Sequence, residues 1–205
     1  MLAAMLAEFG QKAGQVIVFD LHTGAGPYGY PALLSVSPVD HAGLAWGAET
    51  FGPAMVPVIT GAAATTNTGI AATATGYVSA FMRAAMPQAR VLPLVMECGT
   101  LSSAEMQRRV VDDNWLHLYG KPESERGQRI KTDLVHGFIP QDLSWQQICL
   151  STSLRHFDTA LTALKKVEAK PGSAAVRQAR CRLRPRALPP SKWLICINPL
   201  ARWRF

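Results

Sequence analysis

The stretch that decides the fold is Val16-Ile17-Val18-Phe19-Asp20-Leu21-His22-Thr23-Gly24. Its first four residues are β-branched or aromatic and predict a buried strand, and Gly24 predicts the turn that ends it. The strand therefore finishes on an acid and a histidine. In an open α/β sheet the carboxyl ends of the strands border the crevice where ligands bind. His22 is therefore a candidate proton carrier or metal ligand, and the alternative is a histidine packed for structure alone.

A second apolar run of the same kind is Val91-Leu92-Pro93-Leu94-Val95-Met96-Glu97-Cys98-Gly99-Thr100. Glutamate is depleted in strands and costly to bury, so Glu97 needs either a polar partner or a chemical role. The alternative is a carboxylate exposed in the turn after the strand. If the two strand ends converge, His22 and Glu97 lie in one crevice, as in a metal-assisted hydrolase.

Strand-like and helix-like segments alternate along the chain. Apolar runs predict strands near residues 15–20, 32–36, 55–60 and 91–98. Helical patterns cover residues 76–85, 104–118, 124–138 and 143–167. Ser102 or Ser103 can cap the second of these helices, with Glu105 in its first turn. The alternation predicts an α/β fold, with a mostly parallel sheet and helices on both faces.

The segment from Asp20 to Gly29, DLHTGAGPYG, resembles the third zinc-ligand segment of the zinc carboxypeptidase superfamily. It is most similar to an uncharacterised bacterial branch related to aspartoacylase and succinylglutamate desuccinylase. The resemblance implies that His22 is a zinc ligand and that Glu97 is the general base that activates zinc-bound water. It covers most of the chain, and the substrate that it implies is a peptide or an N-acyl amino acid with a free carboxylate.

The sequence departs from that family in one respect. The family takes its first two zinc ligands from an HxxE motif upstream of the Asp-Leu-His segment, and none of the five histidines here has Glu three residues later. A zinc site needs at least three protein ligands. We therefore expect an incomplete zinc-carboxypeptidase-like domain, the carboxyl-terminal part of a hydrolase, which is inactive by itself. Whether this chain is an enzyme stays open at this point, and a non-catalytic remnant is the alternative.

Two further residues flank the candidate site. Asp20 shares a strand face with His22, because alternate residues point to the same side, and it can orient the imidazole. A capping acid at the strand end is an equal alternative. Tyr28 follows in the loop and is a candidate for the substrate cleft, with simple packing as its alternative.

Basic residues gather at the carboxyl end. The formal net charge of the 205-residue chain is +7, yet residues 170–205 contain nine Lys and Arg residues and no acid. We therefore divide the chain into residues 1–169, the hydrolase-like domain, and residues 170–205, a tail expected to be unstructured or out of frame. The alternative is an arm that binds nucleic acid or an anionic surface. Composition alone specifies no such motif, so nucleic acid is not an expected partner.

The remaining features indicate a cytoplasmic protein. No apolar run reaches the ~18 residues of a membrane-spanning helix, and the first residues lack the basic start of a signal peptide. We therefore expect no membrane partner. The four cysteines, Cys98, Cys149, Cys181 and Cys196, show neither a CxxC pair nor the spacing of a disulfide framework. The sequence specifies no oligomeric state.

Overall fold

A computed structural model describes residues 2–10, 13–38, 41–60, 70–72, 76–166 and 192–197. Its strands are β1 (Gln15–Thr23), β2 (Pro31–Ser37), β3 (Met55–Thr60), β4 (Ile70–Ala72), β5 (Arg90–Cys98) and β6 (Lys192–Ile197). Its helices are α1 (Leu2–Phe9), α2 (Ala42–Phe51), α3 (Val78–Ala85), α4 (Ser103–Tyr119), α5 (Glu125–Phe138) and α6 (Leu143–Lys166), with a short 3-10 helix at Gly52–Ala54.

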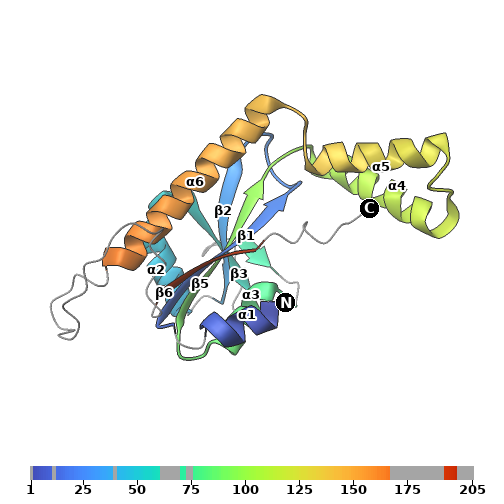
Figure 1. The fold of residues 1–205 in the computed structure, drawn as a ribbon. Helices are drawn as coiled ribbons and strands as arrows, with labels where there is room; N and C mark the ends of the chain where they lie inside the picture. Colours follow the sequence, from blue (N-terminus) through green and yellow to red (C-terminus); the bar gives the residue numbers. More distant parts are fainter. Residues whose placement is uncertain are drawn as a thin grey trace, which may run out of the picture. The chain divides into compact units, whose positions relative to one another are not determined.

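The strands form one sheet in the order β4-β3-β2-β5-β1-β6 (Figure 1). The neighbours β1 and β5 are parallel, because Arg90 N donates to Gly14 O at their start and Gly24 N donates to Cys98 O at their end. β3 and β4 are parallel as well. The predicted α/β fold with a mostly parallel sheet is confirmed.

β2 is an exception to the parallel arrangement. Gly99, directly after β5, donates its N–H to the carbonyl oxygen of Tyr30, directly before β2. The start of β2 therefore lies beside the end of β5, so these two neighbours run in opposite directions. This antiparallel step places the loop between β1 and β2 against the residues that follow β5.

The described chain divides into two compact units. Among the described residues, unit 1 comprises residues 2–10, 13–19, 35–38, 41–60, 70–72, 76–94, 156–166 and 192–197, and unit 2 comprises residues 20–34 and 95–155. The boundaries fall inside strands β1, β2 and β5 and inside helix α6. Unit 1 therefore contains the first halves of β1 and β5, and unit 2 contains their carboxyl ends.

Helices cover both faces of the sheet in unit 1, as predicted. Val16 and Val18 pack with buried residues of α1 and α3, among them Leu6 and Met82. Phe19 points to the other face, where its ring meets Phe51 of α2 and Phe157 of α6. Because both sides of β1 are covered, its run from Val16 to Phe19 is apolar at every position rather than at alternate ones.

The helices of unit 2 begin at the polar residues that cap them. Ser102 and Glu105 form a capping box at the start of α4, in which each side chain bonds the other's backbone N–H. This arrangement satisfies two N–H groups that a helix start otherwise leaves without partners, and it confirms Ser102 as the predicted cap. In α6, the buried Trp145 donates its indole N–H to Gly99 O at 2.8 Å. That bond connects α6 to the residues that follow β5.

The carboxyl-terminal segment differs from the expected unstructured tail in its described part. Lys192–Ile197 forms β6, which pairs with β1. Its sequence from Trp193 to Ile197 is rich in aromatic and β-branched residues, which favour strands. An unpaired edge of β1 also presents backbone groups that such a segment can bond. The rest of the predicted tail, residues 170–191 and 198–205, lies outside the described residues.

No helix among the described residues combines the length and the apolar character that a bilayer crossing requires.

The contact between α2 and the sheet in unit 1 gives a first prediction. A Cβ added to Gly43 would overlap the backbone oxygen of Val91. Alanine normally improves a helix by about 1 kcal/mol over glycine, but overpacking against backbone costs about 1–3 kcal/mol. We therefore expect Gly43→Ala to lower the free energy of unfolding in urea denaturation.

The control for that variant is Ala48→Gly, at an exposed position of the same helix. It should lose about 1 kcal/mol from helix propensity alone. A Gly43→Ala protein as stable as the wild type would contradict the close approach of α2 to β5.

Candidate functional site

The carboxyl ends of β1 and β5 bring His22 and Glu97 together in unit 2. His22 Nδ1 lies 3.7 Å from Glu97 Oε2. On the other side of the ring, His22 Nε2 lies 3.1 Å from Asp20 Oδ2. We call these three side chains the Asp20–His22–Glu97 cluster. The convergence expected from the two strand ends is therefore present, and Asp20 lies beside the imidazole as its strand position predicts.

The loop after β1 holds Glu97 in place. Ala25 N donates to Glu97 Oε1 at 2.9 Å. The backbone reaches this position through Gly24, whose φ of 122° lies in a region that favours glycine. The same loop passes so close to Gly99 that a Cβ there would overlap the oxygen of Pro27. Glycines on both sides of the contact therefore let the loop approach the end of β5.

The pKa values of the cluster are shifted by burial and by mutual charge. Burial raises the pKa of Glu97, and the hydrogen bond from Ala25 and the nearby His22 partly oppose that rise. Asp20 raises the pKa of His22 through a close contact with its ring, burial opposes this, and the charges of Asp20 and Glu97 add to the rise. Both shifts favour the protonated forms. The cluster therefore binds protons more tightly than the isolated side chains do.

The two oxygens of Glu97 have different surroundings. Oε1 accepts the backbone N–H of Ala25, whereas Oε2 faces His22. The Glu97 side chain is only 14% exposed, and that of His22 is 40% exposed. A buried carboxylate with one oxygen fixed and the other beside a half-exposed imidazole can accept a proton and release it again. This is the chemistry that the cluster supports directly.

Several polar atoms around the cluster have no hydrogen-bond partner among the described residues. They are Asp20 Oδ1, His22 Nε2, Thr23 Oγ1 and Thr100 Oγ1. His22 Nε2 nevertheless lies 3.1 Å from Asp20 Oδ2. Thr100 was not singled out from the sequence, although it closes the strand-end motif Glu97-Cys98-Gly99-Thr100. Thr100 is only 2% exposed. A hydroxyl that is buried without a hydrogen-bond partner is uncommon in folded proteins.

Tyr28 is exposed and its hydroxyl is bonded to the start of α6. It donates to Asp142 Oδ2 at 2.8 Å, and Asp142 Oδ1 accepts the Ser144 N–H at 2.9 Å. The Ser144 hydroxyl, which also donates to Asp142 Oδ1, lowers the pKa of Asp142 most, followed by the Tyr28 hydroxyl and then the Ser144 N–H. Asp142 therefore caps α6 and fixes Tyr28 at the same time. The sequence had suggested only a cleft or packing role for Tyr28, and Asp142 is the partner that it did not reveal.

The described residues do not fit a resident zinc ion. A zinc site needs three or four donor atoms that converge on one point. Within the described part of the chain, no group of three or more His, Cys, Asp or Glu side chains has such an arrangement. In the Asp20–His22–Glu97 cluster each ring nitrogen of His22 faces a carboxylate instead. His22 would therefore need donors from outside the described residues to take part in a zinc site.

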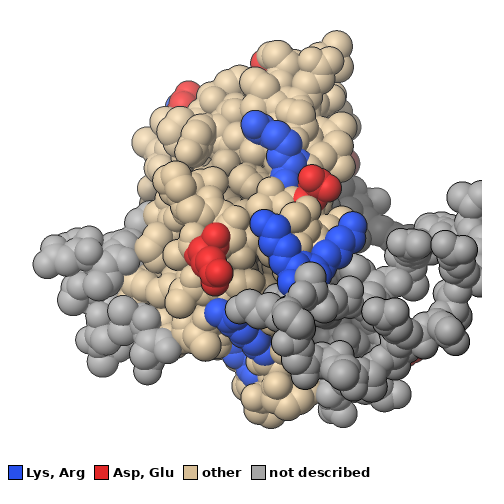
Figure 2. Space-filling model, turned by 90° about the vertical axis from the view of Figure 1, so that its left-hand side faces the viewer, with Lys and Arg blue, Asp and Glu red and all other residues tan. Residues whose placement is uncertain are grey.

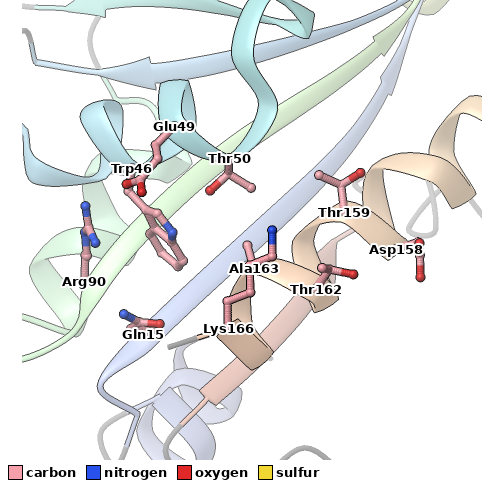
Figure 3. A pocket seen from close by; sticks show the side chains of 10 residues that line it. All are labelled: Gln15, Trp46, Glu49, Thr50, Arg90, Asp158, Thr159, Thr162, Ala163 and Lys166. Carbon is pink, nitrogen blue, oxygen red and sulfur yellow. The ribbon is translucent and has the colours of Figure 1, made fainter. Parts of the chain in front are cut away.

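A separate pocket of about 590 Å³ lies in unit 1 (Figure 3). Residues at the first positions of β1 and β5, Gln15 and Arg90, line it together with residues of α2 and α6. Arg90 lies 5.0 Å from the ring centre of Trp46. The lining carries acids as well as bases, and Figure 2 shows the two kinds of charge interspersed on one face. Such mixed charge does not single out a ligand class.

The shifts within the cluster predict an order of effects. Asp20→Asn should lower the pKa of His22 most, because Asp20 is the largest cause of its rise, and Glu97→Gln should lower it less. His22→Gln should raise the pKa of Glu97, because the imidazolium lowers it. NMR titration of the His22 ring protons measures the first two effects. An unchanged His22 pKa in Asp20→Asn would contradict the contact.

The raised pKa of His22 also predicts a pH dependence of stability. The folded pKa lies above the unfolded value of about 6.5, so this stabilisation is fully present below that pH. It is lost as the pH rises through the folded pKa. The difference in unfolding free energy between wild type and His22→Gln should therefore shrink as the pH rises from about 6.5 through the folded pKa of His22. Urea denaturation across this range measures it, and a constant difference would refute the linkage.

Comparison with known proteins adds a family. The family model described as "Protein of unknown function (DUF2817)" matches residues 1–152. No curated protein and no solved structure matches the chain. The matched range contains β1, β5 and every residue of the Asp20–His22–Glu97 cluster, and it ends within α6. The chain therefore belongs to the DUF2817 family.

Proposed function

We propose that this chain supplies Glu97 and His22 to a metallocarboxypeptidase-like site that hydrolyses amide bonds. The observation that carries this proposal is the position of Glu97. It is a mostly buried carboxylate at the end of a central strand, fixed by the Ala25 N–H and next to His22. The resemblance of the Asp20–Gly29 segment to a zinc-ligand segment supports the same assignment. We place the protein in the cytoplasm, with a peptide or an N-acyl amino acid as the substrate class.

Glu97 is the proton acceptor in this proposal. A general base works best when its pKa lies close to the working pH. Burial moves the pKa of Glu97 in that direction. The Ala25 N–H keeps one oxygen in place, so the other can take a proton from water without a change of rotamer. His22, half-exposed beside that oxygen, is the side chain that meets an incoming ligand first.

The proposed site needs more donors than the described residues contribute. His22 and Glu97 cannot by themselves hold zinc, which takes at least three protein ligands. We therefore expect this chain to hydrolyse no amide on its own. The proposal assigns it the proton acceptor and one ligand, and it assigns the other ligands to groups outside the described residues.

Zinc content tests this division of the site. The purified full chain and a His22→Ala control are dialysed against zinc and then against metal-free buffer, and bound zinc is measured by mass spectrometry. We expect equal zinc in both proteins, far below one ion per chain. About one zinc per chain in the wild type, lost in His22→Ala, would show that further ligands of this chain complete the site.

Turnover provides a second, independent test. The full chain with added zinc is incubated with N-acetyl amino acids and with short peptides, beside a Glu97→Gln control. We expect the two proteins to release the same background amount of amino acid. Hydrolysis by the wild type that disappears in Glu97→Gln and with a chelator would overturn the expectation of an inactive chain, and it would establish Glu97 as the catalytic base.

A further inference from the structure

Two thiols share a buried cluster beside the candidate site in unit 2. Cys98 is the last residue of β5, and Cys149 lies in α6. Together with Trp145 they form an apolar cluster in which the cysteines are 7% and 8% exposed. Burial raises the pKa of the Cys98 thiol, and the neighbouring Cys149 adds to that rise. Both cysteines are free thiols, and both belong to this one buried cluster.

The elements around these thiols already hold them together. Trp145 donates its indole N–H to Gly99 O at 2.8 Å, which fixes α6 to the residue that follows Cys98. Cys149 lies one helical turn after Trp145, so it is on the same face of α6. The two sulfurs are therefore brought together by contacts that do not depend on the thiols themselves.

We propose that Cys98 and Cys149 form an intramolecular disulfide when the protein meets a hydroperoxide. The bond would join the end of β5 to α6, one residue after Glu97. This inference rests on the thiol pair alone and does not depend on the proposed hydrolase function. The disulfide would make the cysteine pair a site of reversible oxidation, because thiol reductants convert the disulfide back to two thiols.

The chemistry has two steps. The Cys149 thiolate attacks the hydroperoxide, so that an S–O bond forms, the O–O bond breaks and an alcohol leaves. Cys98 then attacks the oxidised sulfur of Cys149, so that the S–S bond forms, the S–O bond breaks and water leaves. The two thiols together give up two electrons, which reduce the hydroperoxide to alcohol and water.

The surroundings assign the first step to Cys149. Cys98 lowers the pKa of Cys149 and so offsets part of the rise that burial causes, whereas Cys149 raises the pKa of Cys98 further. Burial raises the pKa of both thiols, and only thiolates react with the oxidant. The reaction should therefore be slow at neutral pH and faster as the pH rises.

Peptide mapping of the full wild-type chain tests the proposal. The protein is treated with tert-butyl hydroperoxide, its remaining thiols are alkylated in denaturant, and it is digested with trypsin without reduction. The expected product is a linked pair of peptides, residues 91–108 and 132–155, which separates on reduction. Recovery of these peptides only in alkylated form would overturn the proposal. So would links from either of them to Cys181 or Cys196 in place of each other.

Trapping with dimedone tests the order of the steps. In Cys98→Ser the oxidised Cys149 has no partner, so dimedone should label residues 132–155. In the matched Cys149→Ser variant, residues 91–108 should carry several-fold less label. Stronger labelling of Cys98 than of Cys149 would reverse the assigned roles. The wild-type map needs no substitution, so it remains decisive even if a variant fails to fold.

Discussion

Two backbone hydrogen bonds, Arg90 N to Gly14 O and Gly24 N to Cys98 O, join β1 and β5 as parallel neighbours at both of their ends. This pairing is the constraint on which the candidate site depends. In parallel strands the carboxyl ends meet at one edge, so the last polar residue of each strand is carried to the same place. A shift in register of one residue would turn the side chains of β5 to the opposite face and separate Glu97 from His22.

The alternation of β5 gives the two sides of its end different chemistry. Successive side chains of a strand point to opposite faces. Glu97 therefore faces His22 and the Ala25 N–H, while Cys98 enters the apolar cluster with Trp145 and Cys149. The charged side chains lie on one face of the sheet, where hydrogen bonds compensate the cost of burying them. The two thiols lie on the opposite face, where burial raises their pKa values and so keeps them protonated. One strand end thus supports a proton site and a thiol pair without mixing them.

Electrostatics favours the protonated form of His22 in this cluster. An imidazole between two carboxylates is stabilised in its charged form, and a charged imidazole has no lone pair to offer a metal. The backbone N–H on Glu97 adds to this by stabilising the carboxylate. A metal-binding arrangement of the same residues would need His22 deprotonated and further donors converging on it. Within the described residues those donors are not assembled.

The amino-acid sequence by itself determined the α/β class, the strand ends near His22 and Glu97 and a helix cap at Ser102 or Ser103. Each of these is encoded by neighbouring residues, through apolar runs, β-branched residues and turn or capping signals. Only the tertiary structure decided which atoms meet. The Ala25 N–H on Glu97, Tyr28 on Asp142 and Cys98 beside Cys149 join residues far apart in the chain or on different elements.

The same distinction accounts for β6. The composition of residues 170–205 predicted an unstructured tail. This segment has nine basic residues, several prolines and no acid, and its apolar residues do not recur with the spacing of a helix or a strand. The short apolar segment Lys192–Ile197 becomes a strand only because β1 offers it an edge to pair with. Strand pairing is a long-range interaction whose hydrogen bonds lie between segments. The local sequence of a segment does not reveal these hydrogen bonds, because they form only when the chain folds and brings the two segments together.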